Sequence, residues 1–257
     1  MTKIHPSSVI DPSAVLHDGV EVGPFCHIGP LVEIGPGTRF LGHATVAGPT
    51  KIGASNIFYP YCSIGHRSQD LKYSAEPTYL EIGDNNSFRE FCTVNRGTLP
   101  GTKTTIGNNG NFLAYSHIAH DCTVGDHVIF SNNGTLAGHV TVEDHAIIGG
   151  LSGVHQFCRI GRHSITGGCT KIVQDVPPYM IADGNPAEVR GVNQVGLERR
   201  GFQPEDSRAL REAYRLLYRS NLNVKQACEK IAEDHSGPDV IRHLLEFIES
   251  SGRGIIR

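Results

Sequence analysis

Apolar residues recur at every sixth position along most of the chain. In steps of six, the apolar series covers positions 4–64, 82–94 and 106–160. It lapses at Thr166 and is restored at Ile172. The residues in this phase are Ile4, Ile10, Leu16, Val22, Ile28, Ile34, Phe40, Val46, Ile52, Phe58, Ile64, Ile82, Phe88, Val94, Ile106, Phe112, Ile118, Val124, Phe130, Leu136, Val142, Ile148, Val154 and Ile160.

A period of six fits neither an α-helix nor an ordinary β-meander, but it fits one short strand followed by one turn. Three such units close a triangular coil of about 18 residues, with one apolar side chain from each face pointing inward. Successive coils then stack at the strand spacing of about 4.8 Å. The pattern therefore predicts a mainly β protein whose residues 1–190 form a parallel β-helix. Right-handed crossovers are the general rule, so the period leaves the hand open.

Small residues occupy a second column, four positions after the apolar one. Five of the seven cysteines fall in it, and the chain has no C-x-x-C motif. We expect these cysteines to be small buried residues at tight corners, with disulfides, metal ligation or a nucleophilic thiol as the alternatives. The column consists of Ser8, Ala14, Cys26, Ala44, Cys62, Cys92, Ser116, Cys122, Gly134, Ala146, Ser152, Cys158 and Ser164.

Two insertions interrupt the array, one at residues 66–81 and one near residues 98–105. Loops that leave a regular solenoid often carry its function, although insertions are also tolerated without one. The array ends near the two prolines Pro177 and Pro178, each of which lacks a backbone donor.

Residues 191–257 show helical spacing and predict a small C-terminal helical domain. Three apolar faces indicate three helices, the first of which begins near Pro204. Their members are Leu210, Tyr214, Leu217 and Tyr218, then Val224, Ala227, Cys228 and Ile231, then Ile241, Leu244, Leu245 and Ile248. Arg208, Arg211, Arg215 and Arg219 share one side of the first helix. This side is either a solvated face or a landing site for an acidic partner or a phosphate.

Residues 18 apart should be vertical neighbours on successive coils, which places His139 over Asp121. His120 precedes this aspartate, and His117, His155 and Gln156 lie close by in the same array. A neutral histidine beside a carboxylate is suited to general base catalysis, unless the cluster is a set of surface histidines without function.

Gly138 could offer an unobstructed backbone N–H to an oxyanion. The sequence shows no activated serine or cysteine, which favours direct attack by a substrate hydroxyl.

His127, His145 and His163 form another column with 18-residue spacing. Stacked imidazoles could hold zinc, but parallel side chains do not converge as tetrahedral ligation requires. We expect an exposed, solvated column, no metal and no cofactor.

Composition narrows the class of protein. The formal charge of −3 argues against non-specific nucleic-acid binding. No apolar run reaches the roughly 18 residues of a membrane span, and the N-terminus lacks the apolar core of a signal peptide. We expect a soluble cytoplasmic protein without stable membrane insertion.

Several motifs together resemble one enzyme family nearly end to end. They are QDLKY at 69–73, HIAHDC at 117–122, LAGH at 136–139, VHQF at 154–157, QDVPPY at 174–179, RRGF at 199–202 and RGIIR at 253–257. The chain resembles the UDP-N-acetylglucosamine 3-O-acyltransferases, hexapeptide-repeat enzymes that begin lipid A synthesis in Gram-negative bacteria. The resemblance implies a left-handed β-helix and a homotrimer with active sites between subunits.

The resemblance also implies roles for single residues. His120 would deprotonate the glucosamine 3-hydroxyl, Asp121 would orient His120, and the Gly138 amide would stabilise the oxyanion. The acyl donor would be a 3-hydroxyacyl-acyl carrier protein, and Gly168 would leave room for a long chain of the 3-hydroxymyristoyl kind. The implied substrate contacts are Gln69, Asp70, Lys72, His117, His139, His155, Gln156, Asn193, Arg199 and Arg200.

The sequence departs from the family pattern at Asn95, Val195 and residues 66–68. These departures leave a 3-amino analogue of the sugar open as the acceptor. The later N-acyltransferase of the pathway is a rival, but it carries an extra N-terminal domain before its repeats. Rivals of another class are a zinc-dependent hexapeptide carbonic anhydrase and a non-catalytic scaffold.

Overall fold

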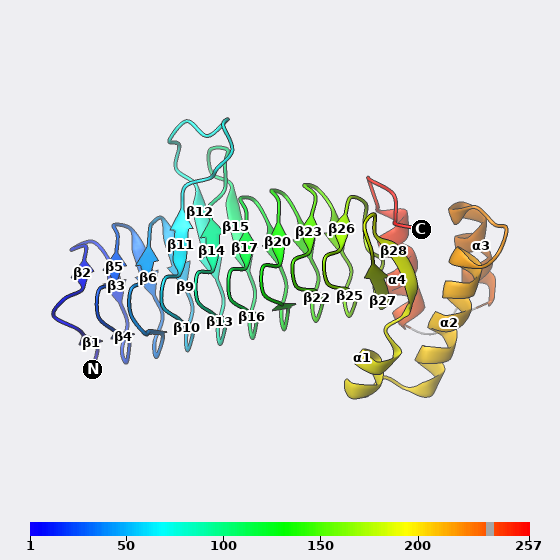
Figure 1. Cartoon of the computed structure of the whole chain (residues 1–257), viewed down its shortest axis with the longest axis horizontal. Coiled ribbons are helices and arrows are strands. Elements are labelled where there is room, and N and C mark those ends of the chain that lie inside the picture. The colour runs from blue at the N-terminus through cyan, green and yellow to red at the C-terminus, as the bar shows by residue number, and fades with distance from the viewer. Residues whose placement is uncertain (235–238) are drawn as a thin grey trace.

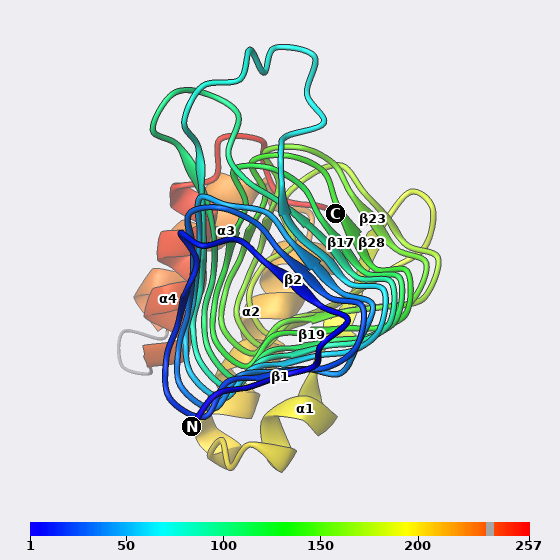
Figure 2. The same cartoon turned by 90° about the vertical axis from the view of Figure 1, so that its left-hand side faces the viewer.

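The computed structural model describes residues 1–234 and 239–257. The chain winds into a long prism of triangular cross-section, with helices packed at its C-terminal end (Figures 1 and 2). Short strands form three faces, which we name A, B and C in chain order. Every strand pair is parallel except the last, β27 with β28.

The strands belong to the faces as follows. Face A contains β1 (Lys3–Ile4), β4 (Glu21–Val22), β7 (Arg39–Phe40), β10 (Ile57–Phe58), β13 (Ser87–Phe88), β16 (Asn111–Phe112), β19 (Ile129–Phe130), β22 (Ile147–Ile148), β25 (Ile165–Thr166), β27 (Met180–Asp183) and β28 (Glu188–Val192). Face B contains β2 (Val9–Ile10), β5 (His27–Ile28), β8 (Thr45–Val46), β11 (Ser63–His66), β14 (Thr93–Asn95), β17 (His117–Ile118), β20 (Thr135–Leu136), β23 (Gly153–Val154) and β26 (Lys171–Ile172). Face C contains β3 (Val15–Leu16), β6 (Val32–Ile34), β9 (Thr50–Ile52), β12 (Tyr79–Ile82), β15 (Lys103–Ile106), β18 (Thr123–Val124), β21 (Thr141–Val142) and β24 (Arg159–Ile160).

The predicted apolar series fills the inside of the prism. From Val22 onward its members are almost completely buried, whereas Ile4 at the open first coil is 46% exposed. Five phenylalanine rings follow one another along the inside of face A, with ring centroids 4.6–5.3 Å apart; the first four are stacked and the last is tilted. Thr166, where the series lapses, is also buried, and its hydroxyl accepts the N–H of Gly149 at 2.8 Å. The hydrogen bond offsets the cost of burying a polar group in the core.

The five column cysteines are buried and free, which confirms the prediction of small corner residues. Burial raises the pKa of Cys122 to about 12 and that of Cys158 to about 11. These two thiols therefore stay protonated at neutral pH and are poor nucleophiles.

The 18-residue spacing between vertical neighbours holds for regular coils but fails at the two insertions. Ile82 pairs with Ile52 below it and with Ile106 above it, so its neighbours are 30 and 24 residues away. Both insertions join face B to face C, between β11 and β12 and between β14 and β15. The two loops project side by side from the prism, as Figures 1 and 2 show.

Four helices follow the strands: α1 (Gln194–Arg199), α2 (Pro204–Tyr218), α3 (Val224–Asp234) and α4 (Asp239–Glu249). The three predicted helices are confirmed, and the short α1 is an addition that the spacing did not predict. The C-terminal tail closes the last coil, because Asp175 exchanges backbone hydrogen bonds with Gly254 and Ile256. Among the described helices, none has the length and apolar character needed to cross a bilayer.

Candidate active site

The predicted histidine–aspartate pair lies where the chain turns from face B to face C, after β17. We name the stacked turns at this edge the B–C corner. Asp121 takes the left-handed conformation that the turn requires, with φ of 59°. Its Oδ2 lies 2.8 Å from His120 Nδ1, and the two side chains are 7% and 12% exposed. Because a carboxylate can only accept, His120 carries its proton on Nδ1 and presents Nε2 as the free base.

The Asp121 carboxylate gathers further partners. The backbone N–H of Thr98 donates to its Oδ2 at 3.1 Å, and Nε2 of His139 lies 3.8 Å away. Burial raises the pKa of the carboxyl, but the hydrogen bonds from Thr102, His120 and Thr98 and the nearby His139 imidazole outweigh burial, so the pKa lies below its ordinary value of 3.8. Asp121 is therefore ionised at neutral pH and can stabilise a protonated His120.

The His120 Nε2 atom faces the first inserted loop, where Asp70 Oδ2 lies 3.9 Å away. The Asp70 carboxylate also accepts the backbone N–H of Lys72 at 2.9 Å, which is a local turn of the loop. The base thus has a carboxylate on each side. One orients its Nδ1, and the other borders the space in front of its Nε2.

Gly138 packs directly against the base from the next coil. A Cβ atom at this position would lie 2.3 Å from His120 Cε1 and 2.5 Å from Nε2, so a larger residue would collide with the imidazole. In the part of the chain that the structure describes, the Gly138 N–H donates to no protein acceptor. This N–H is thus unused by the protein, as the predicted role of oxyanion donor requires.

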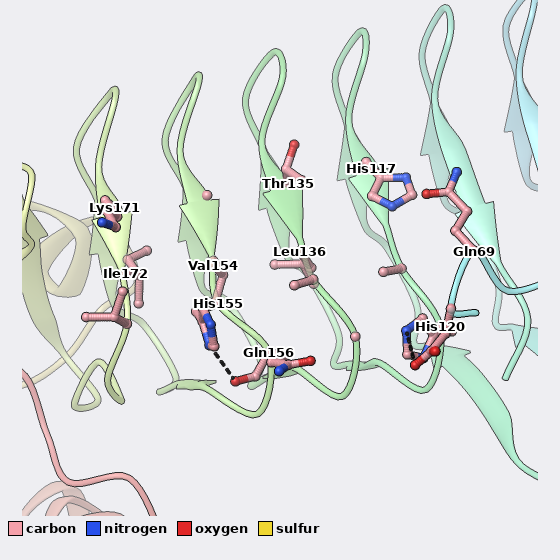
Figure 3. A pocket seen from close by; sticks show the side chains of 16 residues that line it. Gln69, His117, His120, Thr135, Leu136, Val154, His155, Gln156, Lys171 and Ile172 are labelled. Atoms are coloured by element: carbon pink, nitrogen blue, oxygen red, sulfur yellow. Dashed lines mark hydrogen bonds and ion pairs between the residues drawn. The ribbon is translucent and has the colours of Figure 1, made fainter. Parts of the chain in front are cut away.

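A groove of about 540 Å³ runs along face B beside the pair (Figure 3). Seven of the predicted site residues line it: Gln69, Asp70, His117, His120, Gly138, His155 and Gln156. Burial, and then the nearby His120, lower the pKa of His117, whose Nδ1 lies 2.7 Å from the Thr93 hydroxyl. His117 is therefore a neutral hydrogen-bonding group at pH 7. Two further residues of face B also line the groove, Thr135 and Lys171, which the sequence did not indicate as site residues.

The remaining predicted residues lie outside this groove. His139 stacks on Phe157 at the B–C corner, and Lys72 is exposed in the first loop. Gly168 is exposed near Gly150, whose carbonyl oxygen would be 3.5 Å from an added Cβ.

Asn193 and Arg200 lie at the edge where face C turns to face A, and Arg199 ends α1 directly before Arg200. Asn193 Nδ2 donates to the carbonyl of His163 at 2.9 Å, and Arg200 Nη1 lies 2.7 Å from His145 Nδ1. One chain therefore does not bring these three residues to its own groove.

The second histidine column stacks in parallel, with ring centroids 4.7 Å and 4.6 Å apart. The expectation that it is exposed and solvated is wrong for His163, which packs edge-on against Phe202. Burial, and then nearby cations, lower the pKa of His163 to about 3. Within residues 1–234 and 239–257, ligand atoms of a possible metal site lie within 4.8 Å of one another at His120, Asp121 and His139 instead.

Two of the three departures from the family pattern, Asn95 and residues 66–68, lie at the first loop, and the third, Val195, lies on α1. Asn95 is 5% exposed, and its Nδ2 donates to the carbonyl of Arg67 at 3.1 Å, so it anchors the loop. Val195 is 58% exposed on α1.

Comparisons with known proteins identify the family of the chain. Residues 175–256 match the sequence family described as Udp N-acetylglucosamine O-acyltransferase, domain 2. The chain is 48% identical over 262 residues to the acyl-[acyl-carrier-protein]–UDP-N-acetylglucosamine O-acyltransferase of Burkholderia lata, with both chains covered completely.

Solved structures agree as well. The UDP-N-acetylglucosamine O-acyltransferase (LpxA) of Moraxella catarrhalis superimposes with a TM-score of 0.95 at 45% identity, and LpxA of Acinetobacter baumannii with 0.95 at 46%; in both cases 99% of each chain is covered. The prism is accordingly a left-handed parallel β-helix. On this full-length identity, the chain belongs to the acyl-[acyl-carrier-protein]–UDP-N-acetylglucosamine O-acyltransferases.

Proposed function

We propose that the protein transfers a 3-hydroxyacyl chain from acyl carrier protein to the glucosamine 3-hydroxyl of UDP-N-acetylglucosamine, the first step of lipid A biosynthesis. Family membership supports the reaction. The observation that carries the mechanism is the His120–Asp121 pair, which turns a free Nε2 toward the groove.

In the proposed mechanism, His120 Nε2 takes the proton of the sugar hydroxyl as its oxygen attacks the thioester carbonyl carbon. The new C–O bond gives a tetrahedral oxyanion, which accepts the N–H of Gly138. Asp121 stabilises the imidazolium through Nδ1–H. The C–S bond then breaks, the carbonyl re-forms, and the imidazolium returns the proton to the leaving thiolate. No covalent enzyme intermediate is needed.

The groove supports a polar acceptor next to an acyl chain. Asp70, Gln69 and the nearby Lys72 would bind sugar hydroxyls and phosphate. On face B, His117, His155 and Gln156 would contact the sugar, the diphosphate or the acyl chain. Gly168 leaves space beside Gly150, which supports a long chain of the 3-hydroxymyristoyl kind. A panel of 3-hydroxyacyl carrier proteins tests this, and preference for a ten-carbon chain would contradict it.

We propose that the enzyme works as a homotrimer. Asn193, Arg199 and Arg200 lie apart from their own groove, so they would serve the groove of a neighbouring subunit as contacts to the nucleotide or the donor. A column of exposed rings with centroids 4.8–5.1 Å apart supports a buried subunit contact, because large exposed apolar patches mark interfaces. Its members, at the turns from face A to face B, are Phe25, His43, Tyr61, Phe91 and Tyr115.

The arginine side of α2 supports docking of an acidic carrier protein. Arg208 is exposed, and Arg215 forms an exposed ion pair with Glu212 at 2.8 Å. Exposed pairs of this kind contribute little to stability, so an incoming acidic surface can compete for them. We expect the reaction to take place in the cytoplasm. The comparisons give no support to a 3-amino acceptor or to a zinc-dependent carbonic anhydrase.

Mass spectrometry of the product formed from UDP-N-acetylglucosamine and 3-hydroxyacyl carrier proteins tests the reaction, the chain length and the acceptor together. The His120→Ala variant tests the base, and we expect its kcat to fall by about 10²- to 10⁴-fold. Acyl transfer at the wild-type rate by this variant would refute the base assignment.

A further inference from the structure

The two inserted loops are joined by a buried hydroxyl pair. Ser68 Oγ in the first loop lies 2.7 Å from Thr98 Oγ1 in the second, and the two residues are 5% and 2% exposed. Thirty positions separate them in the sequence. A side-chain bond between two loops, shielded from water, fixes their relative position more firmly than an exposed one.

Each of these hydroxyl-bearing residues also forms a hydrogen bond with one of the two aspartates beside His120, Ser68 with the backbone of Asp70 and Thr98 with the carboxylate of Asp121. The Ser68 hydroxyl accepts the backbone N–H of Asp70 at 3.1 Å. The backbone N–H of Thr98 donates to Asp121 Oδ2 at 3.1 Å, and the Thr102 side chain hydrogen-bonds to the same carboxylate. The first loop thus carries Asp70, which faces His120 Nε2, and the second loop donates a hydrogen bond to Asp121, which faces His120 Nδ1.

The contacts close into a ring through His120. Its Nδ1 lies 2.8 Å from Asp121, and its Nε2 lies 3.9 Å from Asp70. Other buried hydroxyls of these loops behave differently: Thr78 and Thr104 are fully buried, and their Oγ1 atoms have no partner among the described residues. Burial alone therefore does not account for the Ser68–Thr98 bond.

We propose that Ser68, Thr98 and Thr102 are positioning residues that couple the loop carrying Asp70 to the Asp121 carboxylate. The inference rests on the proposed roles of His120 as base and Asp70 as acceptor contact. It assigns the second loop a task in catalysis, since this loop supplies a backbone donor to Asp121. Acceptor binding at Asp70 and orientation of His120 then both depend on the hydrogen bond between Ser68 and Thr98.

The test measures kcat and the KM for UDP-N-acetylglucosamine in Ser68→Ala, Thr98→Val and the double variant. All three variants remove the Ser68–Thr98 bond, and Ser68→Ala also removes the acceptor of the Asp70 N–H. We expect each variant to lower kcat by about 10- to 100-fold and to raise KM, and the double variant to match Ser68→Ala within about twofold. Thr98→Ser keeps the hydroxyl and should restore wild-type kinetics. The matched controls Thr78→Val and Thr104→Val remove a buried hydroxyl without a partner, and their kinetics should equal the wild type.

Two loops with independent tasks would give a different result: Ser68→Ala would change only KM, Thr98→Val would change only kcat, and the double variant would show both losses. That pattern, or kinetics like those of the controls, would overturn the inference. Melting temperatures of all variants separate kinetic loss from unfolding, and Ser68→Ala serves as the second probe if Thr98→Val is unstable. If His120→Ala is inactive and Ser68→Ala behaves like the controls, the coupling alone is refuted. If His120→Ala is active, the base assignment is refuted and the coupling with it.

Discussion

Replacing Gly138 by alanine should disable the base without altering any ionisable group. The backbone of Gly138 does not take the left-handed conformation, so an alanine is sterically allowed there by the main chain. The obstacle is the imidazole of His120, which would meet the new Cβ at 2.3–3.0 Å through three of its ring atoms. Ordinary contacts of a Cβ begin at 3.4 Å, so the ring or the coil must move by about 1 Å.

The imidazole cannot absorb this movement freely, because it is 12% exposed and bonded to Asp121 at 2.8 Å. A misplacement of about 1 Å costs on the order of 10²-fold in rate. A disturbed oxyanion donor costs about 10²- to 10³-fold when it is lost completely. We therefore expect kcat to fall by about 10²- to 10³-fold in Gly138→Ala.

Steady-state kinetics with purified Gly138→Ala measures this loss, and circular dichroism and the melting temperature report on the fold. Gly191→Ala is the matched control, because a Cβ built on Gly191 meets nothing within 4 Å. A folded Gly138→Ala enzyme whose kcat stays within about twofold of the wild type would refute the close contact of Gly138 with the base.

Three further predictions follow from the same geometry. Asp121→Asn should lower kcat by about 10²- to 10⁴-fold, because an amide no longer holds the Nδ1–H tautomer of His120. Since the native pKa of Asp121 lies below 3.8, its carboxylate stabilises the fold fully above about pH 4 and less as the pH falls further. The melting temperature of this variant should therefore change less with pH below pH 4 than that of the wild type. The pKa of His163 is about 3 in the folded chain against 6.5 ordinarily, so stability should fall as the pH drops from about 6.5 toward 3, and urea titrations of His163→Phe should show less of this loss. Added Zn²⁺ should inhibit the enzyme by binding His120, Asp121 and His139, whose ligand atoms lie within 4.8 Å of one another; a chelator should restore activity, and inhibition that persists in His139→Ala would contradict the site.

The sequence predicts the prism and the vertical pairing of Asp121 with His139 for one physical reason. A β-helix repeats the same local packing in every coil, so the apolar position of one turn predicts that of the next. The pairing of Asp121 with His139 follows from the same regularity, and the structure places the two 3.8 Å apart.

Features that depend on packing between distant segments lay outside that regularity. His163 is half-buried because Phe202, which follows α1, packs against it, and α1 itself is too short to show a helical period. The backbone donor of Thr98 has no sequence signature, since every residue except proline has an N–H.

The positions of the two loops explain why the active site forms at this corner. Counted strictly in steps of 18, Ile64 and Ile82 would share a face, but the structure places them on faces B and C. Both insertions therefore replace the B–C turn of their own coil, and Asp121 occupies the same turn in the next coil. Lengthening a turn leaves the strands on either side in register, so the loops can only extend outward over the neighbouring turns of that edge. His120 and Asp121 thus lie on the first regular B–C turn after two enlarged ones. Asp70, which faces His120, belongs to the first of those enlarged turns.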